Sequence, residues 1–296
     1  MKNNNWMSYL DDNITLDKLS IPGTHDTGTM GVSAVVKGFA RTQNFGIYRQ
    51  LEDGIRFLDI RLKNNKDSLV VVHGVVSCNL SFEDVLNDCS KFLINNPKET
   101  VIMLVNNEGS NIESNFSQYL KMDAYRDLFY LDTTLPNLGL LRGKVVLFRR
   151  FEASESLHMG VNLSKGWEDN ATFPMTTPSG IKLQIEDEYK EHNTKKKYKI
   201  VKDSINSAID NPNDGIIYIT YNSISSKLTH TPYKYAWGGR GSGIDPAMNP
   251  SMTEYLHPMT GIKRFGVVML DFYNNNKDNI NNENVELIIK SNPLVT

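Results

Sequence analysis

The chain has 296 residues, a formal net charge of −2 and a pI of about 6.3. Its length allows one large α/β domain with a full core, and its charge balance argues against a nucleic-acid partner, which normally requires a strongly basic protein surface. No run of 18 apolar residues is present, so we expect no transmembrane span.

The N-terminal segment, residues 1–6, is polar and rich in asparagine. It lacks the basic stretch and apolar core of a secretory signal, so we expect either a protein that stays in the cell or a mature form. No linker rich in proline, glycine or serine divides the chain, which predicts a single domain over residues 1–296. Cys78 and Cys89 do not have a metal-ligand spacing, so we expect free thiols, with a disulfide as the alternative.

Apolar, β-branched runs alternate with helical segments along most of the chain. The eight runs are Leu16–Ile21, Ile55–Leu62, Leu69–His73, Thr100–Val105, Lys144–Arg149, Ile181–Ile185, Ile216–Tyr221 and Phe265–Leu270. This alternation predicts a (β/α)8 barrel of the TIM type. Only six residues join the second and third runs, whereas a parallel crossover needs roughly 10–12 or more. We therefore expect an irregular unit or a hairpin at this point, and a distorted barrel.

The clearest helix is predicted over Ser81–Asn95. Ser81 and Asp84 form an acidic variant of the capping box, and the Asn-Pro pair at 96–97 ends the helix. Its apolar face comprises Phe82, Val85, Leu86, Cys89, Phe92 and Leu93. We interpret the lysines at 195–197 as the solvated start of another helix, with contact to anionic lipid as the alternative.

Each apolar run ends in polar residues. These ends are His25-Asp26, Asp59 with Arg61, His73, Asn106-Asn107-Glu108, Arg149-Arg150, Glu186-Asp187, Asn222-Ser223 and Asp271. In a (β/α)8 barrel the active site lies at the C-terminal ends of the strands, so we expect these side chains to meet. Asp59 and Arg61 are two residues apart in one strand and project to the same face.

Two histidines and one arginine, His25, His73 and Arg61, end the first three polar-tipped runs. An isolated histidine at a strand end is more often a hydrogen-bonded structural residue. Three such clusters together favour catalysis, because two imidazoles supply a general base and a general acid. The guanidinium stabilises the charge that develops on phosphoryl oxygens. This set predicts metal-free cleavage of a phosphodiester.

The segment Ser20–Asp26, which reads Ser-Ile-Pro-Gly-Thr-His-Asp, carries a specific resemblance. From Trp6 to about Tyr273 the sequence resembles the bacterial phosphatidylinositol-specific phospholipase C family. The further matches are Asp59-Ile60-Arg61, His73-Gly74, residues 96–100, residues 142–144, Trp167 with Asp169-Asn170, Asp187 with Tyr189, residues 232–236 and Asp271. The family fold is a distorted (β/α)8 barrel, as expected from the strand pattern.

The resemblance implies a two-step mechanism with five catalytic residues. His25 is the expected general base, which deprotonates the inositol 2-hydroxyl so that it attacks phosphorus and forms a 1,2-cyclic phosphate. His73 is the expected general acid, which protonates the departing diacylglycerol oxygen, and Arg61 stabilises the phosphate. Asp271 is expected to bond His25 and Asp26 to pair with His73. Hydrolysis of the cyclic phosphate is the expected slower second step.

The resemblance also implies a substrate site that comprises Asp59, Arg150, Asp187 and Tyr189. Arg150 and Asp187 would bond ring hydroxyls, and Tyr189 would stack on the C–H face of inositol, with core packing as its alternative role. We expect Arg149 to face outward.

Two features depart from the family pattern. Asn106-Asn107 stands where the family carries lysine, so the headgroup preference is expected to differ. A family tryptophan near the rim is also missing, although Val35, Val36 and Phe39 are candidates for an apolar wedge at a membrane. The alternative is a helix packed on the barrel. Trp237, in a glycine-rich loop, is a second rim candidate.

Arg61 stands where a calcium-dependent relative would carry an acidic ligand, so we expect neither a metal nor another cofactor. The main alternative is a metal-dependent glycerophosphodiester phosphodiesterase. That chemistry needs a carboxylate cluster near the second strand end, where Asp59 stands beside Arg61 with no second acid. A non-catalytic lipid or glycan binder is a third possibility, but it should have lost a catalytic group.

The expected partner is phosphatidylinositol, or a glycosylated inositol anchor, at a membrane surface. We expect a monomer with no obligate protein partner and, from the family, a secreted protein.

Overall fold

The computed structural model describes residues 1–154, 158–227, 229–275 and 283–295. Its described strands form one sheet in the order β6-β7-β5-β2-β1-β12-β11-β10-β9, with β3, β4 and β8 off this path. The strands are β1 (Ser20–Thr24), β2 (Phe57–Asn65), β3 (Ser68–His73), β4 (Val76–Ser81), β5 (Val101–Asn107), β6 (Phe129–Tyr130), β7 (Val145–Arg149), β8 (Val161–Asn162), β9 (Thr172–Thr176), β10 (Lys182–Glu186), β11 (Ile216–Tyr221) and β12 (Gly266–Leu270).

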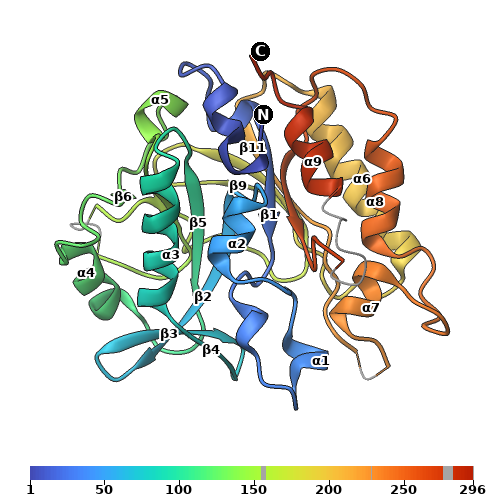
Figure 1. The fold of residues 1–296 in the computed structure, drawn as a ribbon, viewed down its shortest axis with the longest axis horizontal. Coiled ribbons are helices and arrows are strands. Elements are labelled where there is room, and N and C mark those ends of the chain that lie inside the picture. The colour runs from blue at the N-terminus through green and yellow to red at the C-terminus, as the bar shows by residue number, and fades with distance from the viewer. Residues whose placement is uncertain (155–157, 228, 276–282, 296) are drawn as a thin grey trace.

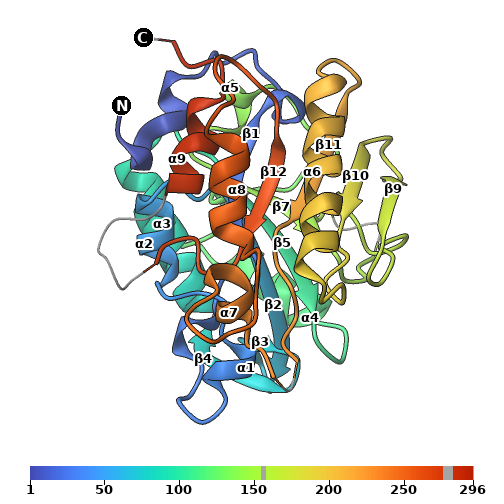
Figure 2. The same cartoon turned by 90° about the vertical axis from the view of Figure 1, so that its right-hand side faces the viewer.

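Helices cover the outside of this sheet. They are α1 (Lys37–Ala40), α2 (Ile47–Glu52), α3 (Phe82–Asn95), α4 (Glu113–Lys121), α5 (Leu138–Leu141), α6 (Thr194–Asp210), α7 (Pro232–Trp237), α8 (Met248–Leu256) and α9 (Glu283–Lys290). Figure 1 shows α2 and α3 in front of the sheet, and Figure 2 shows α6, α8 and α9 over the side formed by β10, β11 and β12. No described helix is long and apolar enough to cross a membrane.

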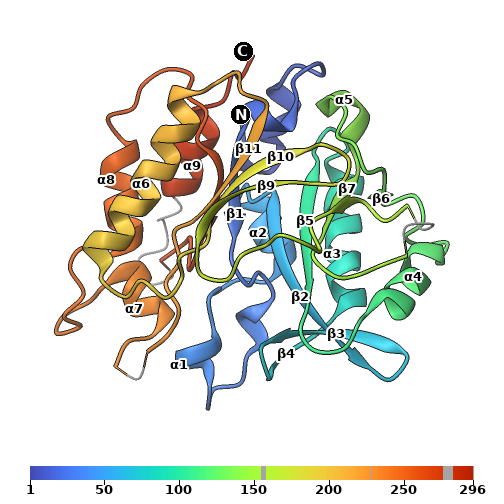
Figure 3. The ribbon, with the colours of Figure 1, turned by 180° about the vertical axis from the view of Figure 1, so that it is seen from behind.

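The expected barrel is present, and seven parallel strands form its continuous wall. In order around the wall they are β7, β5, β2, β1, β12, β11 and β10. The wall is not closed by hydrogen bonds, because no described ladder joins β6 or β8 to β9. Seen from behind, β9 has no helix over it (Figure 3). β9 pairs antiparallel with β10 and ends the sheet at this side. The prediction of a distorted barrel is confirmed.

The third predicted strand lies outside the parallel wall. β3 pairs antiparallel with β2, and β4 then pairs antiparallel with β3, so the short connection makes a hairpin, as its length predicted. Strand β4 was missed because its sequence, Val-Ser-Cys-Asn-Leu-Ser, contains no apolar run. The first predicted run was placed too early. Residues Leu16–Lys18 form a 3-10 turn, and the strand begins at Ser20.

Helix α3 begins with the predicted capping box. The backbone nitrogen of Asp84 donates to Oγ of Ser81, and the Asp84 carboxylate accepts from the Ser81 backbone nitrogen. Cys89 is buried on its apolar face, and both Cys89 and Cys78 are free thiols, as expected.

The lysine run at the start of α6 is only partly solvated, which corrects the sequence interpretation. Lys195 and Lys196 are exposed, but Lys197 is fully buried, and its Nζ lies 2.5 Å from Oε1 of Glu186. Glu186 is also buried, and it accepts from the backbone nitrogens of Glu188 and Tyr221. This pair holds the end of β10, next to the predicted inositol residues.

The N-terminal end of the barrel is closed by the first turn of the chain. Trp6 is fully buried and donates its indole N–H to the carbonyl of Gly54. The buried carboxylate of Glu99 accepts from the backbone of Ser8 and pairs with Arg56 at 2.7 Å. These contacts lie at the end of the barrel opposite the strand tips, where packing serves stability in this fold class.

Candidate active site

The polar strand ends converge on a cavity of about 320 Å³. Its wall includes His25, Arg61, His73, Arg150, Asp187, Tyr189 and Asp271. These residues come from β1, β2, β3, β7, β10 and β12 or from the residues directly after them. The structure therefore brings together the two histidines and Arg61 with three of the four residues expected to bind the substrate, Arg150, Asp187 and Tyr189.

His25 follows β1 and bonds to the residue that follows β12. Its Nδ1 lies 2.8 Å from Oδ1 of Asp271, whose side chain is almost fully buried. Burial opposes the charged form of His25, but the carboxylates of Asp26 and Asp271 outweigh this effect and raise its pKa to about 9. The ring of Tyr221 meets the imidazole edge-on, with centroids 5.9 Å apart.

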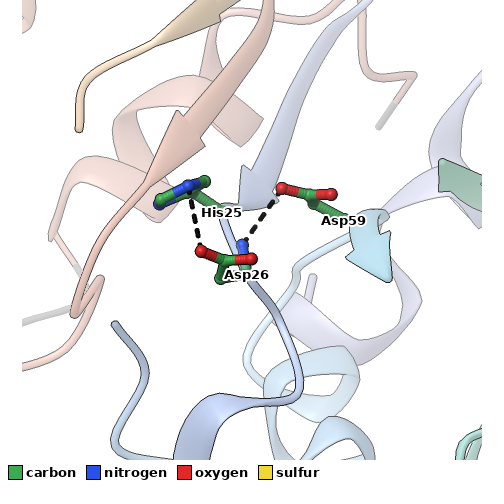
Figure 4. Close-up of side chains that lie close together, drawn as sticks. All are labelled: His25, Asp26 and Asp59. Carbon is green, nitrogen blue, oxygen red and sulfur yellow. Dashed lines mark hydrogen bonds and ion pairs between the residues drawn. The ribbon is translucent and has the colours of Figure 1, made fainter. Parts of the chain in front are cut away.

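Asp26 lies at the centre of the cluster. Its Oδ2 is 3.2 Å from Nε2 of His25 and 3.3 Å from Nε2 of His73, and its Oδ1 is 2.7 Å from Nε of Arg61. Burial opposes ionisation of this carboxyl, but Arg61 and the two histidines lower its pKa below the ordinary value. The expected contact between Asp26 and His73 is therefore present, and a second contact joins Asp26 to His25 (Figure 4).

Arg61 is held by acidic residues from three parts of the chain. Besides Asp26, its guanidinium contacts Asp59 at 3.2 Å and Glu108 at 3.8 Å. Burial works against the charge, but Asp26 and Asp59 raise the pKa of Arg61 well above its ordinary value. The expectation that Asp59 has no second acid beside it was wrong, because Asp26 and Glu108 arrive from neighbouring strand ends that sequence spacing does not relate.

Asp59 lies behind Arg61 and is 1% exposed. Its Oδ2 accepts from the backbone nitrogen of Asp26 as well as from Arg61 (Figure 4 draws the contact with Asp26). A role for Asp59 in substrate binding stays a prediction. In the structure its contacts orient Arg61 and Asp26.

His73 ends β3 and is fixed from the side of α1. Its Nδ1 lies 2.7 Å from the carbonyl oxygen of Ala40. A carbonyl oxygen only accepts hydrogen bonds, so Nδ1 carries a hydrogen and Nε2 faces Asp26. The antiparallel hairpin thus delivers the second imidazole to the same carboxylate that His25 contacts.

Three of the four expected substrate residues, Arg150, Asp187 and Tyr189, line the cavity. The guanidinium of Arg150 lies over the ring of Trp167 at 3.9 Å, and the Trp167 indole N–H donates to Asp187 at 3.1 Å. Burial lowers the pKa of Arg150 and raises the pKa of Asp187. The Tyr189 hydroxyl donates to Asp169 at 2.6 Å, which leaves its ring at the cavity wall.

Arg149 turns away from this cavity, as expected. Its side chain donates to the carbonyls of Met159 and Phe151. Of the pair Asn106-Asn107, which we expected to replace a lysine of the family, Asn106 lines the cavity. The side chain of Asn107 donates to the carbonyl of Gly109 instead.

The predicted rim residues differ in exposure. Phe39 is 51% exposed, and its neighbour Val35 is 91% exposed. Val36 is half-buried and packs against the core. Trp237 is also half-buried, and its indole N–H donates to the carbonyl of Phe272 at 2.7 Å. Membrane insertion of any of these side chains stays a prediction, and the exposed pair on or beside α1 is the better placed.

Ligand atoms of His25, Asp26 and Asp59 lie within 4.8 Å of one another, which makes this cluster the candidate metal site among the described residues (Figure 4). The cluster does not fit a metal ion well. The guanidinium of Arg61 contacts both carboxylates, so a divalent cation between them would face a buried positive charge.

Several residues around the site were not predicted from sequence. Trp167 belongs to one of the motifs that carry the family resemblance, but no role was predicted for it. Gln43 and Asn249 are buried amides that bond the backbone beside His25 and Asp271. Tyr221 is 1% exposed, and its hydroxyl has no hydrogen-bond partner among the described residues. A polar residue inside an apolar run was the available signal for Tyr221, whereas Gln43 and Asn249 lie in segments without a strand pattern.

Residues 19–151 match the family model described as "Phosphatidylinositol-specific phospholipase C, X domain". A 1-phosphatidylinositol phosphodiesterase of Staphylococcus aureus (strain Newman) is 32% identical over 248 residues, which cover 78% of this chain and 79% of the relative. The chain belongs to the phosphatidylinositol-specific phospholipase C family. A second member, the 1-phosphatidylinositol phosphodiesterase of Listeria monocytogenes, is 32% identical over 279 residues, covering 90% of this chain and 80% of the relative.

Solved structures of the phospholipase C family extend the match to the whole fold. A mutant form of the Staphylococcus aureus phosphatidylinositol-specific phospholipase C has a TM-score of 0.88 at 29% identity, and the match covers 100% of this chain and 98% of the mutant's chain. The phosphatidylinositol-specific phospholipase C of Listeria monocytogenes has a TM-score of 0.74 at 28% identity, covering 99% of both chains. The predicted family and fold are therefore confirmed.

Proposed function

We propose that this chain cleaves phosphatidylinositol to diacylglycerol and inositol 1,2-cyclic phosphate without a metal ion. One observation carries the proposal. The Nε2 atoms of His25 and His73 face the same oxygen of Asp26, at 3.2 and 3.3 Å, while the two Nδ1 atoms are held by other groups. Two fixed imidazoles aimed at one point are suited to exchange protons with the two oxygens of a phosphodiester.

In the first step the neutral form of His25 takes the proton of the inositol 2-hydroxyl. The oxygen attacks the adjacent phosphorus, and a new P–O bond closes the cyclic phosphate. Asp271 supports this role because its carboxylate fixes the Nδ1–H tautomer and stabilises the imidazolium that forms. The bond from phosphorus to the diacylglycerol oxygen breaks in the same step.

His73 gives its Nε2 proton to the departing diacylglycerol oxygen. Asp26 contacts this nitrogen and fixes the direction of the imidazole before transfer. Arg61 supplies a fixed positive charge beside both histidines, and its acidic partners hold the guanidinium in place before substrate arrives. In the second step the histidines exchange roles, and water opens the cyclic phosphate.

Arg150, Asp187 and Tyr189 are proposed to bind the inositol ring. Arg150 and Asp187 are joined through Trp167, so a donor and an acceptor are presented with a fixed separation. The ring of Tyr189 offers an apolar surface for the C–H face of the sugar. The resemblance implies that Asn106-Asn107 replaces a lysine of the family, and Asn106 lines the cavity, which supports a different preference among inositol headgroups.

The proposed substrate is a lipid, so the reaction takes place at a membrane surface, with the chain acting as a monomer. Action outside the producing cell remains an expectation from the family. A metal-dependent phosphodiesterase is the second candidate, because Asp26, Asp59 and His25 lie close enough together to share an ion.

Phosphorus NMR of the protein with phosphatidylinositol micelles and excess chelator tests the proposal. We expect a transient cyclic phosphate signal that is absent with His25→Ala. Turnover only after a divalent cation is added would favour the second candidate. No turnover under either condition would overturn the proposed activity on phosphatidylinositol.

A further inference from the structure

Gln43 is a fully buried residue that joins two parts of the catalytic backbone. Its Nε2 donates to the carbonyl oxygen of His25 and to the carbonyl oxygen of Leu270, both at 2.8 Å. Leu270 directly precedes Asp271, the partner of His25. One side-chain amide therefore ties the backbone of the base to the backbone of the carboxylate that orients it.

The orientation of this amide follows from its partners. Both are carbonyl oxygens, which only accept, so the NH2 group of Gln43 has to face them. Its Oε1 is buried and has no hydrogen-bond partner among the described residues. A buried carbonyl without a partner lowers the stability of the fold. Gln43 is thus poorly suited to a purely structural role, and its two donated hydrogen bonds are its distinguishing feature.

The backbone that Gln43 holds is strained on both sides. Asp26, directly after His25, has φ 45°, and Phe272, directly after Asp271, also has φ 45°. Residues with a side chain rarely adopt this conformation, and they keep it only when surrounding contacts determine it. The backbone carbonyl of Thr42, next to Gln43, accepts from the backbone nitrogen of Phe272 at 2.7 Å. Residues 42–43 therefore hold the chain beside both strained positions.

We propose that Gln43 is a positioning residue for the general base, setting the separation of His25 and Asp271 through its side-chain amide. The inference rests on the proposed function and adds a residue that does not touch the substrate. Without the amide, the ends of β1 and β12 are free to shift, and the imidazole loses its fixed direction. Displacement of a catalytic group by about 1 Å costs roughly 10²-fold in rate.

Gln43→Met tests this role, because methionine keeps the length of the side chain and removes both donors. We expect kcat on micellar phosphatidylinositol to fall about 10- to 100-fold, the loss a displaced group produces. KM should stay near the wild-type value, because the proposed inositol residues are on other strands. Gln43→Glu should lose less, because a buried, protonated carboxyl still donates one hydrogen bond.

Asn292→Leu is the matched control. Asn292 is 3% exposed and donates to the carbonyl of Ser20, at the opposite end of β1. The Asn292→Leu variant also loses buried hydrogen bonds to backbone carbonyls, as Gln43→Met does, but none of them lies beside the cavity. If Gln43 only supported the fold, both variants would lose similar stability in thermal unfolding and similar activity. We expect similar losses of Tm but a loss of kcat only in Gln43→Met.

The pKa of His25, measured by proton NMR titration, separates this inference from the proposed function because it needs no substrate. The groups around His25 are Asp26, Asp271, Arg61, Tyr221 and Asp187, and Gln43→Met changes none of them. We expect the pKa to fall in Gln43→Met, since Asp271 moves away, and to stay constant in Asn292→Leu. An unchanged pKa and an unchanged kcat in Gln43→Met would overturn the inference. If wild type has no activity, the NMR result alone decides it.

Discussion

The Nδ1 atom of His73 lies 2.7 Å from the carbonyl oxygen of Ala40, the last residue of α1. The same short helix carries Phe39, which is 51% exposed, and it follows Val35, which is 91% exposed. The proposed general acid is therefore fixed by a segment that carries two exposed apolar side chains. The hydrogen bond between Ala40 and His73 thus joins the predicted lipid contact at α1 to the placement of His73.

A double variant, Val35→Ser with Phe39→Ser, should weaken attack on lipid vesicles. We expect vesicle hydrolysis to fall about tenfold or more. Burial of a large apolar side chain contributes roughly 1.5–3 kcal/mol to the binding free energy, and serine lacks this contribution. Hydrolysis of soluble inositol 1,2-cyclic phosphate should change little. Leu140→Ser is the control, because Leu140 is 68% exposed on α5, at the opposite end of the barrel from α1 (Figure 1). Equal losses in both variants would argue against a rim at α1.

Asp271→Asn should lower the pKa of His25 from about 9 towards its ordinary value of 6.5. The amide keeps the size of the side chain but removes one of the two negative charges that favour the imidazolium. NMR titration of the histidine Hε1 proton measures this shift directly. A pKa that stays near 9 would mean that Asp26 alone sets the protonation of His25.

The stability of the fold should depend on the charge of His25. Its pKa is raised on folding, so its contribution is fully present below pH 6.5 and is lost as the pH rises through about 9. Thermal unfolding should therefore show a declining Tm between these values. His25→Gln should flatten the decline, and an equal decline in this variant would assign the dependence to another group.

Arg61→Lys should cost about 10²- to 10³-fold in kcat, because a lysine cannot contact Asp26, Asp59 and the phosphate with one planar group. Steady-state kinetics with excess chelator measures this loss. Activity close to wild type would show that only the positive charge matters, and activity restored by a divalent cation would point to the metal cluster.

Removal of one partner of the buried pair Lys197 and Glu186 should destabilise the fold. Their side chains are fully buried and 2.5 Å apart, so Lys197→Met leaves a carboxylate without its cation. We expect a loss of about 3–5 kcal/mol in the free energy of unfolding. Adding Glu186→Leu should recover part of the loss in denaturant unfolding, because the stranded charge is then gone. No recovery would mean that packing, not charge, dominates.

Local sequence patterns determined much of this fold and of its catalytic set. Apolar runs with polar tips identified the seven parallel strands, and the capping residues identified α3. His25, Arg61 and His73 could be named because catalytic chemistry restricts residue types and because strand tips meet in a barrel. Periodicity and capping are short-range properties, so they can be read from neighbouring residues.

Only the tertiary structure decided how those residues are held. It set Asp26 between both histidines, brought the carbonyl of Ala40 against the imidazole of His73, and brought Gln43 against the backbone of His25. It also buried Lys197, which looked like a solvated helix start. These contacts join segments that are far apart in sequence, and their energies depend on distance and burial in space. A local pattern carries no signal for either quantity.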